Sequence, residues 1–247
     1  MSSLLKKLAS LTLSSLLFYS VCQATPPSIP NFKAEYLLKH NGIEIGHVKL
    51  TVKQTATNTY RLISATETSG LLAFIRDDDV IETSRFELYE NRLRPLSYQY
   101  KEHLGDGEKN VILTFDWTTL NVANASKGHV WKLPISIGVL DKALMQIALM
   151  RDLNTADGVL SYQIADGGRL KNYVFTRLGT EEITIDDKLY NTIKLARKKD
   201  DKPLITYYWC APELYNLPIL LQRKKTYGTF EMRLIKASFA AKKTEPQ

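Results

Sequence analysis

The chain has 247 residues, of which 44% are hydrophobic and 24% charged, and its formal net charge is +7. The basic residues are dispersed along the sequence, which argues against a nucleic-acid-binding protein and is compatible with anionic lipids or polymers of a cell envelope. A chain of this length can bury a core large enough to be stable without disulfide bonds.

The first 24 residues have the pattern of a cleaved signal peptide. Lys6 and Lys7 form a positive start, an apolar run extends to Val21, and small residues up to Ala24 suit a signal peptidase. We expect cleavage after Ala24 and a periplasmic location. Two alternatives stay open. One is a lipoprotein acylated on Cys22, which Val21 disfavours because a small residue is normally needed there. The other is a retained membrane anchor, for which the apolar run is short.

Residues 25–239 are expected to form a single all-β domain of mainly antiparallel strands, followed by a flexible tail over 240–247. Alternating polar and apolar segments are separated by turn residues, as at Asn41-Gly42 and Asp166-Gly167-Gly168. These local hairpins predict a meander curled into a barrel or half-barrel of about a dozen strands. A change in the phase of the alternation predicts a β-bulge near Gly46. The expected strands lie at Phe32–Leu38, Ile43–Lys53, Tyr60–Thr66, Val80–Leu88, Leu93–Glu102, Val111–Trp117, one or two within Asn121–Lys132, Val159–Ala165, Arg169–Leu178, Glu181–Ile185, Leu189–Lys198, Leu204–Cys210, Pro218–Lys225 and Phe230–Phe239.

One helix is predicted near residues 141–153, within the apolar stretch Leu133–Leu153. Asp141 can cap its first turn, because the carboxylate accepts hydrogen bonds from backbone N–H groups that have no partner inside the helix. Apolar residues cover most of its circumference, which is typical of a helix buried on several sides. The pattern predicts either a core helix that closes one end of the sheet or a lid over an apolar cavity. In the second case, the apolar segment Gly70–Ile75 would help to cover the mouth.

No catalytic or metal-binding constellation is evident. The acidic run Asp77–Asp79 could hold a cation, but it favours a solvated turn. Cys210 is the cysteine that remains after signal cleavage, and its place on an apolar strand favours a buried, inert thiol over a reactive one. We predict no catalytic residues, no metal site and no cofactor, and the sequence favours a protein that is not an enzyme. The four histidines lack the spacing of metal ligands and are His40, His47, His103 and His129.

Aromatic strands give the main indication of function. Tyr98 and Tyr100 share a face of one predicted strand, and Tyr207 and Trp209 share a face of another. These residues either fill the β core or line a concave apolar pocket in which tyrosine hydroxyl groups orient a ligand. We predict that all four bind the ligand, with Trp209 near the rim of the pocket.

Two basic groups, Arg197-Lys198-Lys199 and Arg223-Lys224-Lys225, lie at the ends of predicted strands. A solvated rim of a hairpin is their ordinary interpretation. The alternative is a surface for anionic lipid or polysaccharide, which would also allow peripheral contact with a membrane.

Three parts of the chain together resemble an exported bacterial family, the domain of unknown function 3108. They are the stretch from Leu133-Pro134 to Arg151, the stretch from Tyr208 to Arg223 with Pro212 and Pro218, and the first hairpin with Tyr36, Gly42 and Gly46. The resemblance implies a periplasmic, β-rich protein and supplies no catalytic residues. Cys210 stands where an ordinary apolar residue is expected. More loosely, the Trp–x–x–Pro…Pro pattern is similar to that of the Lol-type periplasmic lipoprotein carriers, which are open barrels with helical lids around an apolar cavity.

Three hypotheses about function follow from these features. The first is an exported binding protein or carrier for an amphipathic or apolar envelope ligand such as a lipid. The second is a structural or interaction protein of the envelope with a filled core and exposed strand edges. The third is a hydrolase whose site is dispersed along the sequence.

Overall fold

One continuous sheet dominates the computed structural model, which describes residues 29–69, 79–104, 107–155, 158–199 and 205–240. Its fifteen strands are β1 (Phe32–His40), β2 (Ile43–Ala56), β3 (Thr59–Thr68), β4 (Asp79–Tyr89), β5 (Arg92–Leu104), β6 (Gly107–Asp116), β7 (Asn121–Ser126), β8 (His129–Pro134), β9 (Leu140–Asp141), β10 (Val159–Asp166), β11 (Arg169–Ile185), β12 (Lys188–Lys199), β13 (Ile205–Ala211), β14 (Leu217–Lys225) and β15 (Gly228–Phe239). A helix, α1 (Leu144–Asp152), precedes β10, and a short 3-10 helix (Pro212–Leu214) joins β13 to β14.

The chain starts in the middle of the sheet and builds it outward. Strands β1 to β8 follow one another to one edge, and the chain then crosses through β9 and α1 to the other edge. From there β10 to β15 return step by step, until β15 pairs with β1. All pairs are antiparallel except the short contact between β9 and β10. The predicted all-β antiparallel meander is confirmed, and β7 and β8 are the strands expected within Asn121–Lys132. The short strand β9 was not expected, and the two strands predicted at Arg169–Leu178 and Glu181–Ile185 form one strand, β11, with a bulge before Gly179.

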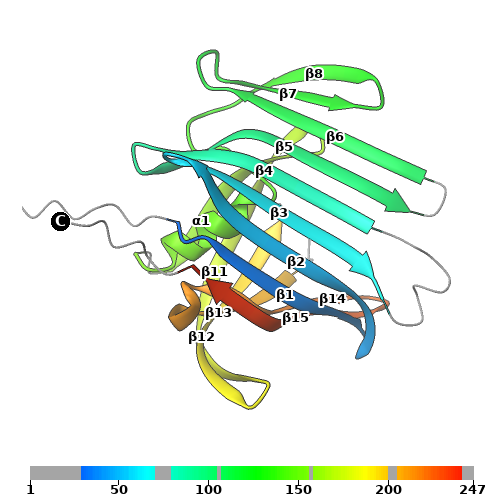
Figure 1. Cartoon of the computed structure of the whole chain (residues 1–247), viewed down its shortest axis with the longest axis vertical. Coiled ribbons are helices and arrows are strands. Elements are labelled where there is room, and N and C mark those ends of the chain that lie inside the picture. The colour runs from blue at the N-terminus through cyan, green and yellow to red at the C-terminus, as the bar shows by residue number, and fades with distance from the viewer. Residues whose placement is uncertain (1–28, 70–78, 105–106, 156–157, 200–204, 241–247) are drawn as a thin grey trace, which may run out of the picture.

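The sheet curls into a half-barrel around α1 (Figure 1). Its two ends approach each other where Trp131 of β8 covers the turn between β10 and β11. A side chain added at Gly168 in that turn would come within 2.7 Å of the Trp131 ring. Close by, the Ser136 hydroxyl lies 3.2 Å from Oε1 of Gln163 in β10. The described strands at the two ends do not pair, so the curl is an open one.

The concave face of the sheet holds the core. In β1, the alternate residues Phe32, Ala34 and Tyr36 are 3%, 1% and 0% exposed, as expected for a strand with one buried face. The bulge predicted near Gly46 is confirmed, because the pairing of β1 with β2 shifts after Leu38. A side chain at Gly46 would collide with the backbone carbonyl of the neighbouring strand β3.

The helix lies inside the curl and is apolar on nearly every side. Leu144, Ile147 and Leu149 are at most 1% exposed and belong to the same core as the sheet residues. The prediction of a core helix is therefore confirmed. The helix is shorter than the predicted 141–153, because Asp141 ends β9. Its carboxylate still performs the predicted role, since Oδ1 accepts hydrogen bonds from the backbone N–H groups of Ala143 (2.9 Å) and Leu144 (2.8 Å).

Within the described residues, no helix is long and apolar enough to cross a bilayer. Several predictions fall outside these residues: the signal peptide with Cys22, the segment Gly70–Ile75, and the tail beyond Ala240.

Candidate functional site

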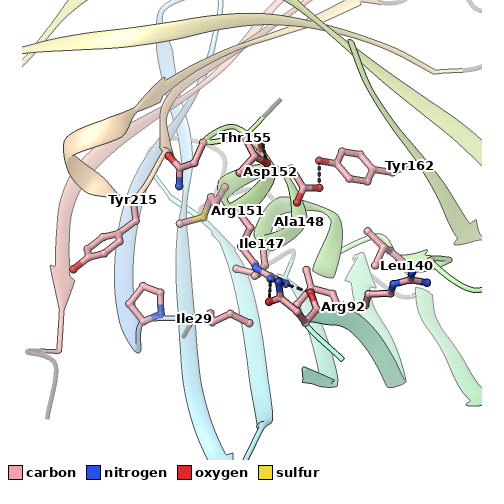
Figure 2. A pocket seen from close by; sticks show the side chains of 16 residues that line it. Ile29, Arg92, Leu140, Ile147, Ala148, Arg151, Asp152, Thr155, Tyr162 and Tyr215 are labelled. Carbon is pink, nitrogen blue, oxygen red and sulfur yellow. Dashed lines mark hydrogen bonds between the residues drawn. The ribbon is translucent and has the colours of Figure 1, made fainter. Parts of the chain in front are cut away.

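A pocket of about 390 Å³ opens beside the C-terminal half of α1 (Figure 2). Segments far apart in the sequence form it: the residues before β1, the turn between β4 and β5, the approach to β9, the helix, and the left-handed Tyr215 after the 3-10 helix. Its floor is apolar and comprises Ile29, Leu93, Leu140, Ile147, Ala148 and Met150. Ala148 is 4% exposed, and its small side chain leaves space that a larger residue would fill.

The rim of this pocket is polar. The Arg151 guanidinium donates hydrogen bonds to the backbone carbonyl (3.1 Å) and the side-chain Oδ1 (2.8 Å) of Asn91. Its Nε is buried and has no hydrogen-bond partner among the described residues. Next to it, Asp152 accepts a hydrogen bond of 2.9 Å from the hydroxyl of Tyr162. Burial raises the pKa of Asp152, while this hydrogen bond and Arg151 oppose the increase.

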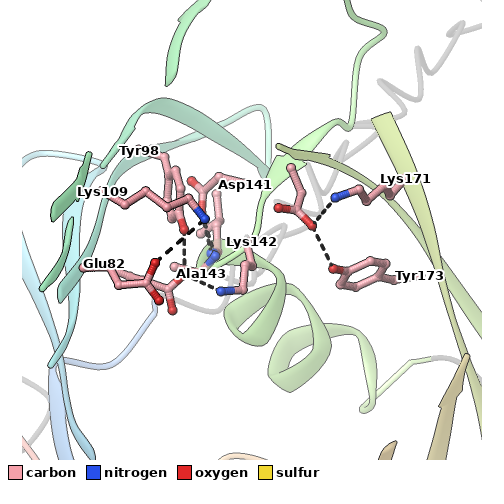
Figure 3. Close-up of polar contacts among 11 residues, drawn as sticks. Glu82, Tyr98, Lys109, Asp141, Lys142, Ala143, Lys171 and Tyr173 are labelled. Carbon is pink, nitrogen blue, oxygen red and sulfur yellow. Dashed lines mark hydrogen bonds and ion pairs between the residues drawn. The ribbon is translucent and has the colours of Figure 1, made fainter. Parts of the chain in front are cut away.

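A buried polar cluster lies at the other end of α1 (Figure 3). Asp141 is fully buried, and its Oδ2 accepts a hydrogen bond of 2.6 Å from the Ser84 hydroxyl. Burial raises the pKa of Asp141 from 3.8 to about 7, even though its hydrogen bonds stabilise the charged form. Lys142 forms an ion pair of 2.9 Å with Glu82 of β4.

Tyr98 and Tyr100, two of the predicted ligand-binding residues, belong to this cluster. Tyr98 is 5% exposed, and its hydroxyl donates to Oε1 of Glu82 at 2.5 Å. Lys142 lies over the ring of Tyr100, 5.3 Å from the ring centroid. Burial raises the pKa of both tyrosines, and for Tyr98 the negative charge of Glu82 adds to this effect. The two hydroxyl groups therefore stay protonated and serve as donors inside the half-barrel.

On the other side of the interior, Asp166 of β10 forms a second ion pair, with Lys171. Its Oδ2 lies 2.7 Å from Nζ of Lys171 and accepts a hydrogen bond of 3.3 Å from the Tyr173 hydroxyl. The cluster thus contains acids that are already paired with lysine, hydroxyl or backbone donors. Asp141 and Lys142 thereby tie the start of α1 to Ser84 and Glu82 of β4.

Tyr207 and Trp209, the other two predicted residues, lie on the opposite face of the sheet. Tyr208, between them in β13, points into the core, where its ring is 5.4 Å from that of Phe175. Neighbouring residues of a strand point to opposite faces, so Tyr207 and Trp209 face outward. Trp209 is only 5% exposed, because Lys194 lies 4.8 Å from its ring centroid and Leu220 is its cross-strand neighbour.

The structure therefore does not bring the four aromatic residues to one pocket. Trp209 is also not at the rim of a pocket, where its ring would be half exposed to solvent. Residues 207 to 209 are all aromatic, so the sequence alone did not show which face of β13 is buried. In the structure, the face with Tyr208 and Cys210 points into the core. A ligand-binding role for Tyr98, Tyr100, Tyr207 or Trp209 stays a prediction.

Cys210 is 0% exposed, and burial raises the pKa of its thiol, so it is held in the unreactive protonated form. This confirms the prediction of a buried cysteine. Within the described part of the chain, no three acidic, histidine or cysteine side chains gather as they would around a metal ion.

Sequence reasoning missed the residues around the pocket beside α1. Ile29, Asn91 and Tyr215 lie in three separate connections, and no periodic pattern links them. Arg151 did give a signal, since it is a cation in the last turn of a short, mostly apolar helix.

Comparisons with known proteins agree with this fold. A crystal structure from Brucella abortus, described as a β-barrel-like protein of domain of unknown function DUF1849, is similar with a TM-score of 0.58 and 8% sequence identity. The likeness covers 85% of this chain and 98% of that one and concerns the fold alone. No curated protein matches the chain. The model of the family described as "Protein of unknown function (DUF3108)" matches residues 34–235, and the chain belongs to this family.

Proposed function

We propose that this protein is an exported binding protein or carrier for an amphipathic molecule of the cell envelope, held in the pocket beside α1. The observation that supports it most is the pocket itself: about 390 Å³ with an apolar floor and a polar rim. Pockets for small molecules typically span about 300–1,000 Å³ and combine apolar walls with few polar groups. A core that served only to stabilise the fold would close around α1.

The apolar floor and the polar rim of the pocket would each bind a different part of such a ligand. Its apolar part would lie against Ile147, Ala148 and Met150 of α1. Its polar group would face Arg151, whose guanidinium is positioned by Asn91. One buried N–H group of Arg151 has no acceptor among the residues that the structure describes. An acceptor on the ligand, such as a carboxylate or an ester carbonyl, would satisfy this donor.

The proposed location rests on the N-terminal sequence. Lys6, Lys7 and the apolar run to Val21 support export, with a mature chain that begins at Thr25. N-terminal sequencing of protein isolated from the producing cell tests this part. A blocked, lipid-modified residue at Cys22 would show a lipoprotein instead.

Binding is tested by titration with N-phenyl-1-naphthylamine, an apolar fluorophore, combined with native mass spectrometry of protein purified from its own compartment. We expect saturable binding in the micromolar range and loss of binding in Ala148→Phe, which fills the pocket. Ala125→Phe is the matched control, since Ala125 lies on the outer face of β7, opposite the exposed Ile112. Melting curves show whether both variants are folded. Equal binding by the two folded variants would contradict the proposed site.

A non-catalytic envelope scaffold is the second candidate, and one observation favours it. β8 is an edge strand of the described sheet, and Val130 within it is 68% exposed. Native mass spectra without any retained ligand, together with a complex that Val130→Lys disrupts, would favour this function over the carrier.

A further inference from the structure

A second hollow, of about 250 Å³, lies on the inner wall of the half-barrel at the end of the strands away from the α1 pocket. The α1 pocket includes Ile29 and Pro30, just before β1, whereas the second hollow includes Leu38 near the end of β1. At about 3.3 Å per residue along a strand, the two are separated by roughly 25 Å. The second hollow is therefore a distinct feature.

Two arginines flank this hollow. Arg197 of β12, Thr206 of β13 and Arg223 of β14 are neighbours in one row across the sheet. Two strand spacings place the Cα atoms of the arginines roughly 10 Å apart, so their long side chains can reach a common ligand. Arg197 donates a hydrogen bond of 3.3 Å to the Thr206 hydroxyl, and its guanidinium lies 5.6 Å from the ring centroid of Tyr208.

Both guanidinium groups lack a negatively charged partner among the described residues. Each has a buried Nε that no hydrogen-bond acceptor of the described residues contacts, and neither is ion-paired with a described acid. Burial raises the pKa of the Tyr208 hydroxyl, and the positive charges of Arg197 and Arg223 both oppose this increase. Tyr208 also lines the same hollow as the two arginines.

Three acids that the described strands place in the interior already have lysine partners. Glu82 pairs with Lys142 at 2.9 Å, Glu102 with Lys109 at 3.8 Å, and Asp166 with Lys171 at 2.7 Å. Among the residues that line the hollow, Glu231 accepts a hydrogen bond of 3.0 Å from Gln222, and both follow the outward-facing register. Two partly buried arginines in a concave wall thus leave a net positive charge that an anion would satisfy.

The row next to the arginines is apolar. Tyr208, Leu221, Met232 and Leu38 are successive neighbours across β13, β14, β15 and β1. Leu221, Met232 and Leu38 are partly buried and pack against the main core. The hollow therefore offers an apolar strip directly beside a pair of cations.

We propose that this inner wall binds an anionic amphiphile, with its phosphate or carboxylate group between Arg197 and Arg223 and its apolar chain along Leu221 and Met232. The site is separate from the pocket beside α1 and does not depend on the function proposed for that pocket. Charge complementarity selects the ligand class, and the Thr206 and Tyr208 hydroxyl groups add donors to the head group.

The test is isothermal titration calorimetry of the full folded protein with dodecyl phosphate below its micelle concentration. Arg197→Gln and Arg223→Gln should each weaken binding about 10- to 100-fold, the usual effect of losing a hydrogen bond to a charged group. Arg85→Gln is the matched control, because Arg85 is exposed on the outer face of β4. It should leave the Kd unchanged, and added salt should weaken the binding of the wild type.

Two further titrants separate the contributions of head group and chain. Dodecyl maltoside has the same chain and no charge, and inorganic phosphate has the charge and no chain. Both should bind at least about 10-fold more weakly than dodecyl phosphate. Equal binding of either compound overturns the amphiphile proposal. Unchanged affinity in both arginine variants, with loss in Ala148→Phe, overturns the site and assigns the ligand to the α1 pocket. Unchanged affinity in Ala148→Phe, with loss in the arginine variants, supports the proposal. Circular dichroism and melting curves confirm that each variant is folded.

Discussion

The two ends of the half-barrel differ although the same strands build both. At the end that holds α1, which we call the closed end, the inner positions are apolar, as in Ile219 of β14 and Leu195 of β12. Toward the other, open end, Arg197 is the next inner residue of β12, and Arg223 follows Leu221 on the inner face of β14. The helix covers the inner wall at one end only, so the inner residues at the other end are less deeply buried and include charged side chains. Where no helix covers the sheet, the concave wall combines an apolar row with two arginines.

The largest expected effect is a pH dependence of the free energy of unfolding, caused by Asp141 at the closed end. The Asp141 carboxyl has a pKa of about 7 in the folded protein, above its ordinary 3.8, because it is buried. Between about pH 4 and pH 7 the folded state binds a proton that the unfolded state lacks, so the free energy of unfolding falls as pH rises. The change over this window is on the order of 4 kcal/mol. Asp141→Asn should abolish it, as measured by urea unfolding at several pH values.

The matched control for this titration is Asp116→Asn. Asp116 is exposed, and hydrogen bonds from Thr119 and Thr118 lower its pKa, so it stabilises the fold when charged and its contribution is lost as pH falls. The two variants should alter the pH dependence in opposite directions. Identical pH profiles for wild type and Asp141→Asn would show that Asp141 is not a titrating group of the closed end.

A pair of leucines compares the two ends directly. Leu144→Ala should lower the free energy of unfolding by about 2–5 kcal/mol, because this side chain is fully buried in α1. Leu221→Ala at the open end should cost roughly 2 kcal/mol less, since its side chain is only partly buried. Chemical denaturation measures both. Equal losses would mean that the open end is packed as tightly as the closed one.

A smaller effect is expected from the hydroxyl of Tyr98. Tyr98→Phe removes its hydrogen bond to Glu82 and should lower the free energy of unfolding by about 1 kcal/mol. Lys142 still pairs with Glu82, which limits the loss. Tyr89→Phe is the control, because Tyr89 is 49% exposed. A loss of the same size in the control would assign the effect to the ring environment and not to the cluster.

The smallest effect belongs to the outer face. Lys194→Met removes the cation over Trp209 and an ion pair of 2.7 Å with Glu181. Such interactions at the protein surface typically contribute less than about 1 kcal/mol. Tryptophan emission of a variant with Trp117→Phe and Trp131→Phe should respond to this change and stay constant when an interior ligand binds. A saturable response of Trp209 to ligand would contradict its outward placement.

The sequence predicted the strands, the helix and its capping by Asp141, because these depend on local alternation and on the properties of single residues. It could not decide the face of Trp209, since both faces of β13 contain aromatic side chains and only tertiary packing separates them. The pocket beside α1 was equally hidden. Ile29, Asn91 and Tyr215 meet there because the sheet curls, and the curl depends on contacts such as that of Trp131 with Gly168.

The pairing of β1 with β15 has a consequence for how this chain folds. It joins Phe32 to Phe239, so the first described strand is completed by the last one. The meanders β1 to β8 and β10 to β15 consist of neighbouring hairpins, and most of these form quickly because few residues separate their strands. The seam between them must wait until nearly the whole chain has been synthesised. Contacts of such long range slow folding, which keeps the chain in an unfolded form for longer.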